Sequence, residues 1–118
     1  MNNIFLLAWM DDWKMSAHLA KISSTYSYDL VFYENGLQLP DSVAQSILIV
    51  DLDNVEENEL QKVSHLQDDD SVFIIGYAMD LDVNQIKHFR GLGYDMVLRR
   101  EKLLRNLDTI LQKVLHAH

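Results

Sequence analysis

The chain has 118 residues, of which 48% are apolar and 24% charged, a composition typical of a folded domain and not of a disordered segment. Ten basic residues against eighteen acidic ones give a formal charge of −8, which argues against DNA or an anionic membrane surface as the main partner. The absence of cysteine excludes thiolate metal sites, thiol redox chemistry and disulfides.

The first predicted strand covers residues 4–10 and is followed by two aspartates, Asp11 and Asp12. Seven apolar residues are too few for a membrane span or the core of a signal peptide, so we expect a soluble, cytoplasmic protein without a membrane partner. A helix is predicted over about 11–24, and either aspartate could cap its start. Its apolar face has helical spacing: Met15, Leu19 and Ile22.

A second strand is predicted at 28–33, where the turn-forming pair Asn35-Gly36 follows it. The third strand is expected at 47–50. The connection between these strands is short, so a helix there would be short or absent.

The second half of the chain continues the alternation. Apolar periodicity predicts a helix at about 56–66, a strand at 72–75, a helix at about 82–92, a strand at 96–98 and a last helix at 101–116. The last helix has the clearest amphipathic pattern of the chain. We therefore expect five strands, most of them followed by a helix.

Strands that are apolar on both faces belong to a parallel sheet covered by helices on each side. The alternation predicts an α/β fold, a flavodoxin-like doubly wound sheet of five parallel strands. Right-handed crossovers with the strand order 2-1-3-4-5 are the simplest closure at this length. No linker is visible, so residues 1–118 are expected to form a single domain.

Acidic residues follow two of the predicted strands directly. Asp11 and Asp12 follow the first strand, and Asp51 follows the third. In a doubly wound sheet the functional crevice lies beyond the carboxyl ends of the strands, which is where these carboxylates are expected. Each of them could instead simply cap the helix or turn that follows.

This order of elements and the spacing of its acids resemble the receiver domain of two-component response regulators. Three stretches carry the resemblance: Met10-Asp11-Asp12, Leu48-Ile-Val-Asp-Leu-Asp53, and Phe89-Arg-Gly-Leu-Gly-Tyr-Asp-Met-Val-Leu-Arg-Arg100. The resemblance covers essentially the whole chain. It implies a signalling protein that acts through contacts with a kinase or an output protein, and not an enzyme.

The resemblance also implies a phosphorylation site at the carboxyl edge of the sheet. Asp51 occupies the place of the phospho-acceptor, and Asp11, Asp12 and Asp51 would hold a divalent cation, Mg²⁺. The register of the acid pair stays open, because Ala8-Trp9 or Met10-Asp11 could occupy its place.

Four residues depart from the family's pattern, and we interpret them as a degenerate switch. Gly76 stands where a hydroxyl residue normally ends the fourth strand, and Tyr77 follows where a small residue is usual. Leu98 replaces the aromatic residue of the fifth strand, and Arg100 replaces a lysine. Arg100 could pair with Asp51 and hold the site closed, with Tyr77 across the entrance. We expect no phosphorylation-driven switch, because the hydroxyl and aromatic groups that would move are missing.

The leading hypothesis is a pseudo-receiver, a module for protein–protein interaction in signal transduction that needs no cofactor. The alternative is a working phospho-acceptor in a two-component phosphorelay, with a histidine kinase and Mg²⁺ acting on Asp51. The family resemblance implies a partner face, and possible homodimer contact, on the helix at 82–92, the strand at 96–98 and the helix at 101–116. Its interface candidates are His88, Arg99, Lys102 and Arg105.

Overall fold

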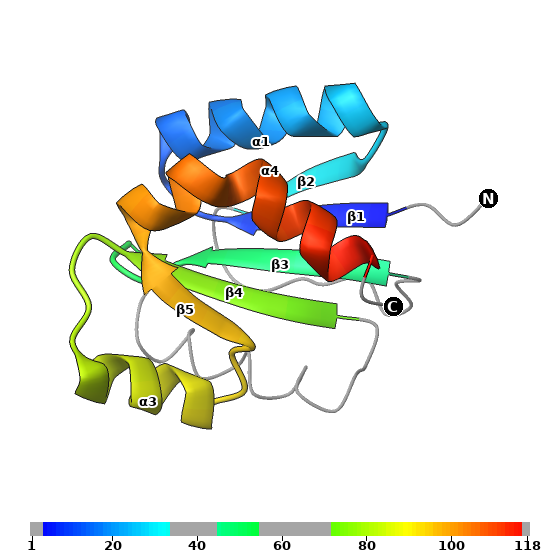
Figure 1. Cartoon of the computed structure of the whole chain (residues 1–118). Coiled ribbons are helices and arrows are strands. Elements are labelled where there is room, and N and C mark those ends of the chain that lie inside the picture. The colour runs from blue at the N-terminus through cyan, green and yellow to red at the C-terminus, as the bar shows by residue number, and fades with distance from the viewer. Residues whose placement is uncertain (1–3, 34–44, 55–71, 117–118) are drawn as a thin grey trace.

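The computed structural model describes residues 4–33, 45–54 and 72–116, and these form a five-stranded parallel sheet with helices packed on it (Figure 1). The strands are β1 (Ile4–Trp9), β2 (Asp29–Tyr33), β3 (Gln45–Asp51), β4 (Val72–Ala78) and β5 (Met96–Arg99). The described helices are α1 (Trp13–Tyr26), α3 (Val83–Gly91) and α4 (Arg100–His116).

The strand order is β2-β1-β3-β4-β5 and every pairing is parallel, which confirms the predicted doubly wound topology. Helices α1 and α4 lie on one face of the sheet and α3 on the other (Figure 1). The helix predicted at 56–66 and the connection that could hold a short second helix lie outside the described residues.

Alternate side chains of each central strand enter two separate cores. In β1, Leu6 and Ala8 face the core under α1 and α4, while Leu7 and Trp9 face the core on the α3 side. All four are almost fully buried. This double burial is why the strand sequences are apolar throughout and do not alternate with polar residues.

Helix α1 begins after Asp12, whose side chain accepts a hydrogen bond from the backbone N–H of Met15. Of the two candidate caps, the structure therefore selects Asp12 and not Asp11. The helix ends at Ser27, which has a left-handed backbone conformation (φ 59°). Helix α3 has a capping box in which Asp82 and Gln85 exchange hydrogen bonds.

Strand β4 is longer than predicted. It continues from Val72 through Gly76 and Tyr77 to Ala78, so Gly76 lies inside the strand and does not end it. Helix α4 likewise starts directly at Arg100, without a loop after β5. These two shifts place Tyr77 and Arg100 at the carboxyl edge of the sheet.

No helix among the described residues is long and apolar enough to cross a membrane.

Candidate functional site

A cleft of about 560 Å³ lies at the carboxyl edge of the sheet, where β1, β3 and β4 end. Five aspartates and one arginine contribute most of its polar lining, and we refer to it as the acidic cleft. Its lining consists of Asp11, Asp12, Trp13, Asp51, Asp53, Asn54, Met79, Asp80 and Arg100. The cleft lies where the sequence places the functional crevice, and it brings together the three aspartates expected there.

Asp12 is the most heavily hydrogen-bonded carboxylate of the cleft. Its Oδ1 accepts from the Met15 backbone N–H (3.1 Å) and from Arg100 Nη2 (3.1 Å). Its Oδ2 accepts from Arg100 Nε (2.8 Å) and from the Tyr77 hydroxyl (3.0 Å). The arginine thus holds both oxygens at once, which is the strong two-point geometry of guanidinium and carboxylate.

This ion pair sets the protonation of Asp12. The hydrogen bonds from Arg100 hold the pKa of Asp12 below its usual range, against the opposing effect of burial. The side chain of Asp12 is only 9% exposed and that of Arg100 26%, so solvent screens the pair less than a surface ion pair. Asp12 is therefore held as a carboxylate.

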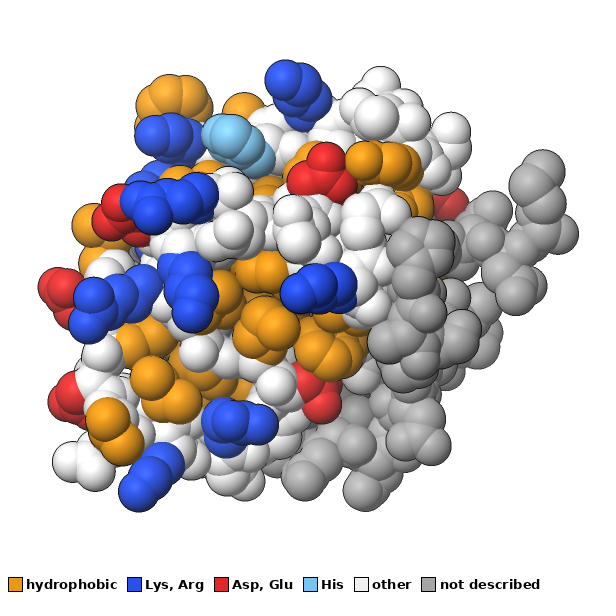
Figure 2. Space-filling view, in the orientation of Figure 1, with side chains coloured by type: hydrophobic (Ala, Val, Ile, Leu, Met, Phe, Trp, Pro, Cys, Tyr) orange, Lys and Arg blue, Asp and Glu red, His pale blue; other side chains and the backbone are white. Residues whose placement is uncertain are grey.

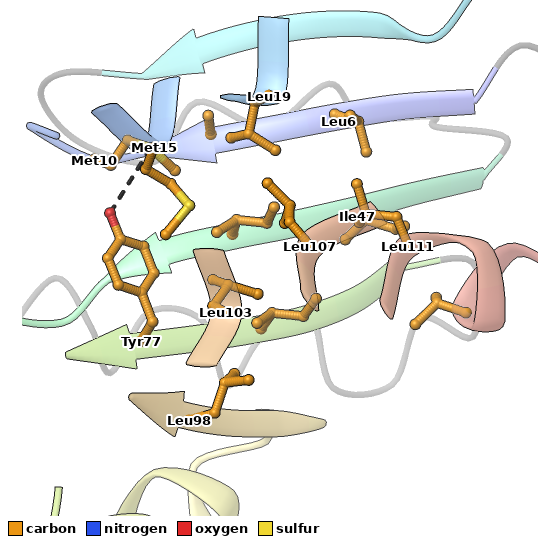
Figure 3. Packing of buried hydrophobic residues seen from close by; sticks show 14 residues of the cluster. Leu6, Met10, Met15, Leu19, Ile47, Tyr77, Leu98, Leu103, Leu107 and Leu111 are labelled. Atoms are coloured by element: carbon orange, nitrogen blue, oxygen red, sulfur yellow. Dashed lines mark hydrogen bonds between the residues drawn. The ribbon is translucent and has the colours of Figure 1, made fainter. Parts of the chain in front are cut away.

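Tyr77 contributes its hydroxyl to the Asp12 end of the cleft from the hydrophobic core. Its side chain is 1% exposed and packs in the core under α1 and α4, with its hydroxyl pointing toward Met10 (Figure 3). The same hydroxyl donates to Asp12, and burial raises the pKa of Tyr77 well above its usual range. The expectation that Tyr77 lies across the entrance is wrong, because its ring is buried in the core.

Gly76 does not face the acidic cleft. A Cβ atom at this position would lie 2.8 and 2.9 Å from the ring of Tyr94 and 3.1 Å from Leu52, on the α3 side of the sheet. The interpretation of Gly76 as the missing hydroxyl position is corrected by this geometry. The hydroxyl group that β4 supplies at this edge belongs to Tyr77, and Gly76 leaves room for Tyr94 to pack against the strand.

Asp51 ends β3 and is 2% exposed. Its Oδ1 accepts from the backbone N–H of Asp53 (3.2 Å) and its Oδ2 from Asn54 Nδ2 (2.5 Å), and the Asp11 backbone N–H also donates to this carboxylate. Burial nevertheless raises the pKa of Asp51. The suggested ion pair between Arg100 and Asp51 is not what the structure contains, because Arg100 binds Asp12.

The register of the acid pair is visible in the structure. Met10 is buried in the core beside Tyr77, Asp11 is exposed at the cleft, and Asp12 caps α1. Ala8 and Trp9 are buried on opposite faces of the sheet. Asp11 and Asp12 are therefore the two acids that follow β1 at the cleft.

The residues do not fit a divalent cation as they are arranged. Carboxylate oxygens are the ligands that Mg²⁺ prefers, and Asp11, Asp12 and Asp51 supply them in type. However, the acceptor positions of Asp12 are already occupied by hydrogen bonds from Arg100, Tyr77 and Met15. Within residues 4–33, 45–54 and 72–116, no group of three or more His, Cys, Asp or Glu side chains is arranged to hold a metal ion.

The predicted interface residues separate into two pairs. Arg99 and Lys102 line a groove of about 660 Å³ between α3, β5 and the start of α4, together with Leu81, Asp82, Val83, Ile86, Val97 and Leu98. We call it the basic-rimmed groove. His88 and Arg105 are exposed but are not part of its lining, and Arg105 pairs with Glu101 (2.6 Å). Leu98 is buried beside Tyr77 and forms part of the floor of the basic-rimmed groove.

Two features of the cleft were not anticipated from the sequence. Asn54 donates a hydrogen bond directly to Asp51, a contact that the sequence does not indicate. The pairing of Arg100 with Asp12 joins residues 88 positions apart. The excess of acids over bases at this edge was the available signal, because a lone cation among carboxylates has several possible partners.

Solved structures with the same fold include receiver domains. The chain resembles a response regulator from Thermotoga maritima with a TM-score of 0.76 at 9% identity, covering 97% of this chain and 98% of that one. It resembles the ChxR receiver domain from Chlamydia trachomatis with a TM-score of 0.71 at 11% identity, covering 98% and 99%.

A further similar structure is a protein assigned to pilus assembly in Burkholderia pseudomallei, with a TM-score of 0.72 at 21% identity over 95% of this chain and 89% of that one. No protein-family profile matches the sequence, and no curated protein matches it. These likenesses establish that the chain has the receiver fold.

Proposed function

We propose, from the premise that this chain has the receiver fold, that it is a signalling module that acts through protein contacts and without phosphorylation. The observation that carries the proposal is the ion pair between Arg100 and Asp12. Arg100 occupies, with Tyr77, the carboxylate that would otherwise help to hold a divalent cation, and that cation would neutralise a phosphoryl group on Asp51. A phosphorylated Asp51 would add charge to a cleft that already contains five aspartates.

The surroundings of Asp51 support the same conclusion. Its two oxygens already accept hydrogen bonds from Asp53, Asn54 and the backbone of Asp11, and these hydrogen bonds reduce their nucleophilicity toward phosphorus. Burial also raises its pKa, which disfavours the carboxylate form that attacks. Neither feature assists a phosphoryl transfer.

The basic-rimmed groove is the surface that we propose for the partner. Figure 2 shows lysine and arginine side chains around apolar ones on the face formed by α3, β5 and α4. Arg99, Lys102 and the 66%-exposed Val83 contribute to it, although the chain as a whole carries a charge of −8. The partner that fits is a protein with acidic side chains around an apolar contact, because its charges complement this rim.

We also propose that the protein is cytoplasmic, because a chain without cysteine needs no oxidising compartment. In this proposal the protein uses no cofactor and has no catalytic activity of its own. The alternative remains a phospho-acceptor on Asp51 with Mg²⁺, which the position of Asp51 at the carboxyl end of β3 favours.

Mass spectrometry after incubation with a small-molecule phosphodonor and Mg²⁺ distinguishes the phosphorylation-independent module from the phospho-acceptor. We expect the intact mass of the wild type to remain unchanged. A gain of one phosphoryl group that is absent in Asp51→Asn would overturn the proposal in favour of the alternative.

The groove is tested separately by light scattering coupled to size-exclusion chromatography. If the partner is a second copy of this chain, the wild type elutes as a dimer and the double variant Arg99→Glu, Lys102→Glu as a monomer. The matched control is Lys14→Glu, which changes one exposed charge on α1. A dimer that persists in the double variant would show that the groove is not its interface.

A further inference from the structure

Every acceptor position of the Asp12 carboxylate is used within the protein. A carboxylate offers about four lone-pair positions. Asp12 fills them with two donors from Arg100, one from Tyr77 and one from Met15, at distances between 2.8 and 3.1 Å. A metal ion could bind Asp12 only by displacing one of these donors.

The donors differ in how easily they could be displaced. The Met15 N–H lies in the first turn of α1 and the Tyr77 ring is buried in the core, so neither group can move without disturbing the fold. Arg100 is partly exposed and reaches Asp12 through a flexible side chain. Arg100 is therefore the donor whose presence decides whether Asp12 is accessible.

The charge balance of the cleft points to the same residue. Five aspartates line it, and Arg100 is the single basic residue of that lining. Close carboxylates repel one another unless a cation lies among them. In this cleft the cation is part of the chain.

We infer that Arg100 acts as a built-in cation that takes the place of a divalent metal ion and keeps the acidic cleft metal-free. The inference deepens the proposed function, on which it rests, because a cleft without a metal ion cannot support phosphoryl transfer. It assigns Arg100 a positioning role, since its guanidinium holds Asp12 toward Tyr77. Removal of that guanidinium frees two acceptor positions on Asp12, next to Asp11 and Asp51 in the same cleft.

The test compares Mn²⁺ binding by the wild type and by Arg100→Met, which keeps an unbranched apolar stem and removes the guanidinium with its charge. Isothermal titration calorimetry gives the affinity. Quenching of tryptophan fluorescence gives the location, because Trp13 lines the cleft and is 83% exposed while Trp9 is buried. We expect Arg100→Met to bind Mn²⁺ at least about tenfold more tightly than the wild type, since the acids then lose their internal cation.

Two further variants make the result specific. Arg90→Met removes one positive charge from an exposed position on α3 and should bind Mn²⁺ as weakly as the wild type. The double variant Arg100→Met, Asp12→Asn should lose the gained affinity, because Asp12 supplies the freed oxygens.

One outcome would overturn the inference: a folded Arg100→Met that binds Mn²⁺ no more tightly than the wild type. Far-UV circular dichroism establishes that each variant is folded. The titrations contain no phosphodonor, so their failure is distinguishable from failure of the proposed function, which is judged by the mass of the protein alone.

Discussion

The two ends of the acidic cleft place their carboxylates in opposite electrostatic environments. At the end of β1, Asp12 is bound by the guanidinium of Arg100, and its pKa is lowered. At the end of β3, Asp51 is buried among neutral donors, and its pKa is raised. The difference shows that the positive charge in this cleft stabilises Asp12 and not Asp51.

The largest expected effect comes from breaking the Asp12 end. Asp12→Ala removes the cap of α1 and leaves Arg100 and the Tyr77 hydroxyl without their shared partner. We expect the free energy of unfolding to fall by about 2–4 kcal/mol, less than for a fully buried ion pair because Arg100 is partly exposed. Urea denaturation followed by tryptophan fluorescence measures it.

The control is Asp80→Ala, which removes an exposed aspartate from the same cleft. It should change the free energy of unfolding by less than about 0.5 kcal/mol. Equal effects of the two substitutions would mean that the Asp12 end is no better stabilised than the rest of the cleft.

Tyr77→Phe tests the same end by removing one hydroxyl. The ring keeps its place in the core, and Asp12 keeps Arg100, so we expect a loss of about 1–2 kcal/mol in the free energy of unfolding. Tyr26→Phe is a matched control, because the exposed Tyr26 also donates to an aspartate, Asp108. A loss in Tyr77→Phe no greater than in this control would contradict a stabilising role for the buried hydroxyl.

Asp51→Asn should stabilise the protein, unlike the two preceding substitutions. The substitution removes a buried charge whose pKa is raised by burial, so the free energy of unfolding at neutral pH should rise by about 0.5–1 kcal/mol. Differential scanning calorimetry at neutral pH would record a higher Tm. A clear loss of stability would mean that Asn54 and the backbone donors more than compensate the buried charge.

The smallest effect is expected in the pH dependence, where the two carboxylates act in opposite directions. The pKa of Asp12 is lower in the folded state, so its contribution is complete above the unfolded value of about 3.9 and is lost as the pH falls through the folded value. The pKa of Asp51 is higher in the folded state, so its destabilising contribution is relieved as the pH falls from neutral toward about 4.

Unfolding free energies measured between about pH 7 and pH 3 test this assignment. Asp51→Asn should lose the gain on mild acidification, and Asp12→Asn should lose part of the decline at the acid end. Profiles of both variants parallel to that of the wild type would show that neither pKa shift contributes to stability.

Much of the fold was predictable because it depends on local patterns. The runs around Leu6 and Leu48 are apolar without interruption, and such runs predict central strands of a parallel sheet. The main error concerned Gly76, which the resemblance to receiver domains placed at the end of the fourth strand, in the position of the usual hydroxyl residue. Its actual role depends on Tyr94, a residue 18 positions away whose packing is not visible in the local sequence.

The sequence by itself determined the order of the strands and the presence of Asp11, Asp12 and Asp51 at one edge of the sheet, because apolar periodicity and strand ends are local properties. Only the tertiary structure decided that Arg100 binds Asp12 and that Tyr77 donates to the same carboxylate from the core. The physical reason is that one cation among five carboxylates has several partners of similar charge. Its choice is made by distance and burial, which exist only once the sheet has brought the strand ends together.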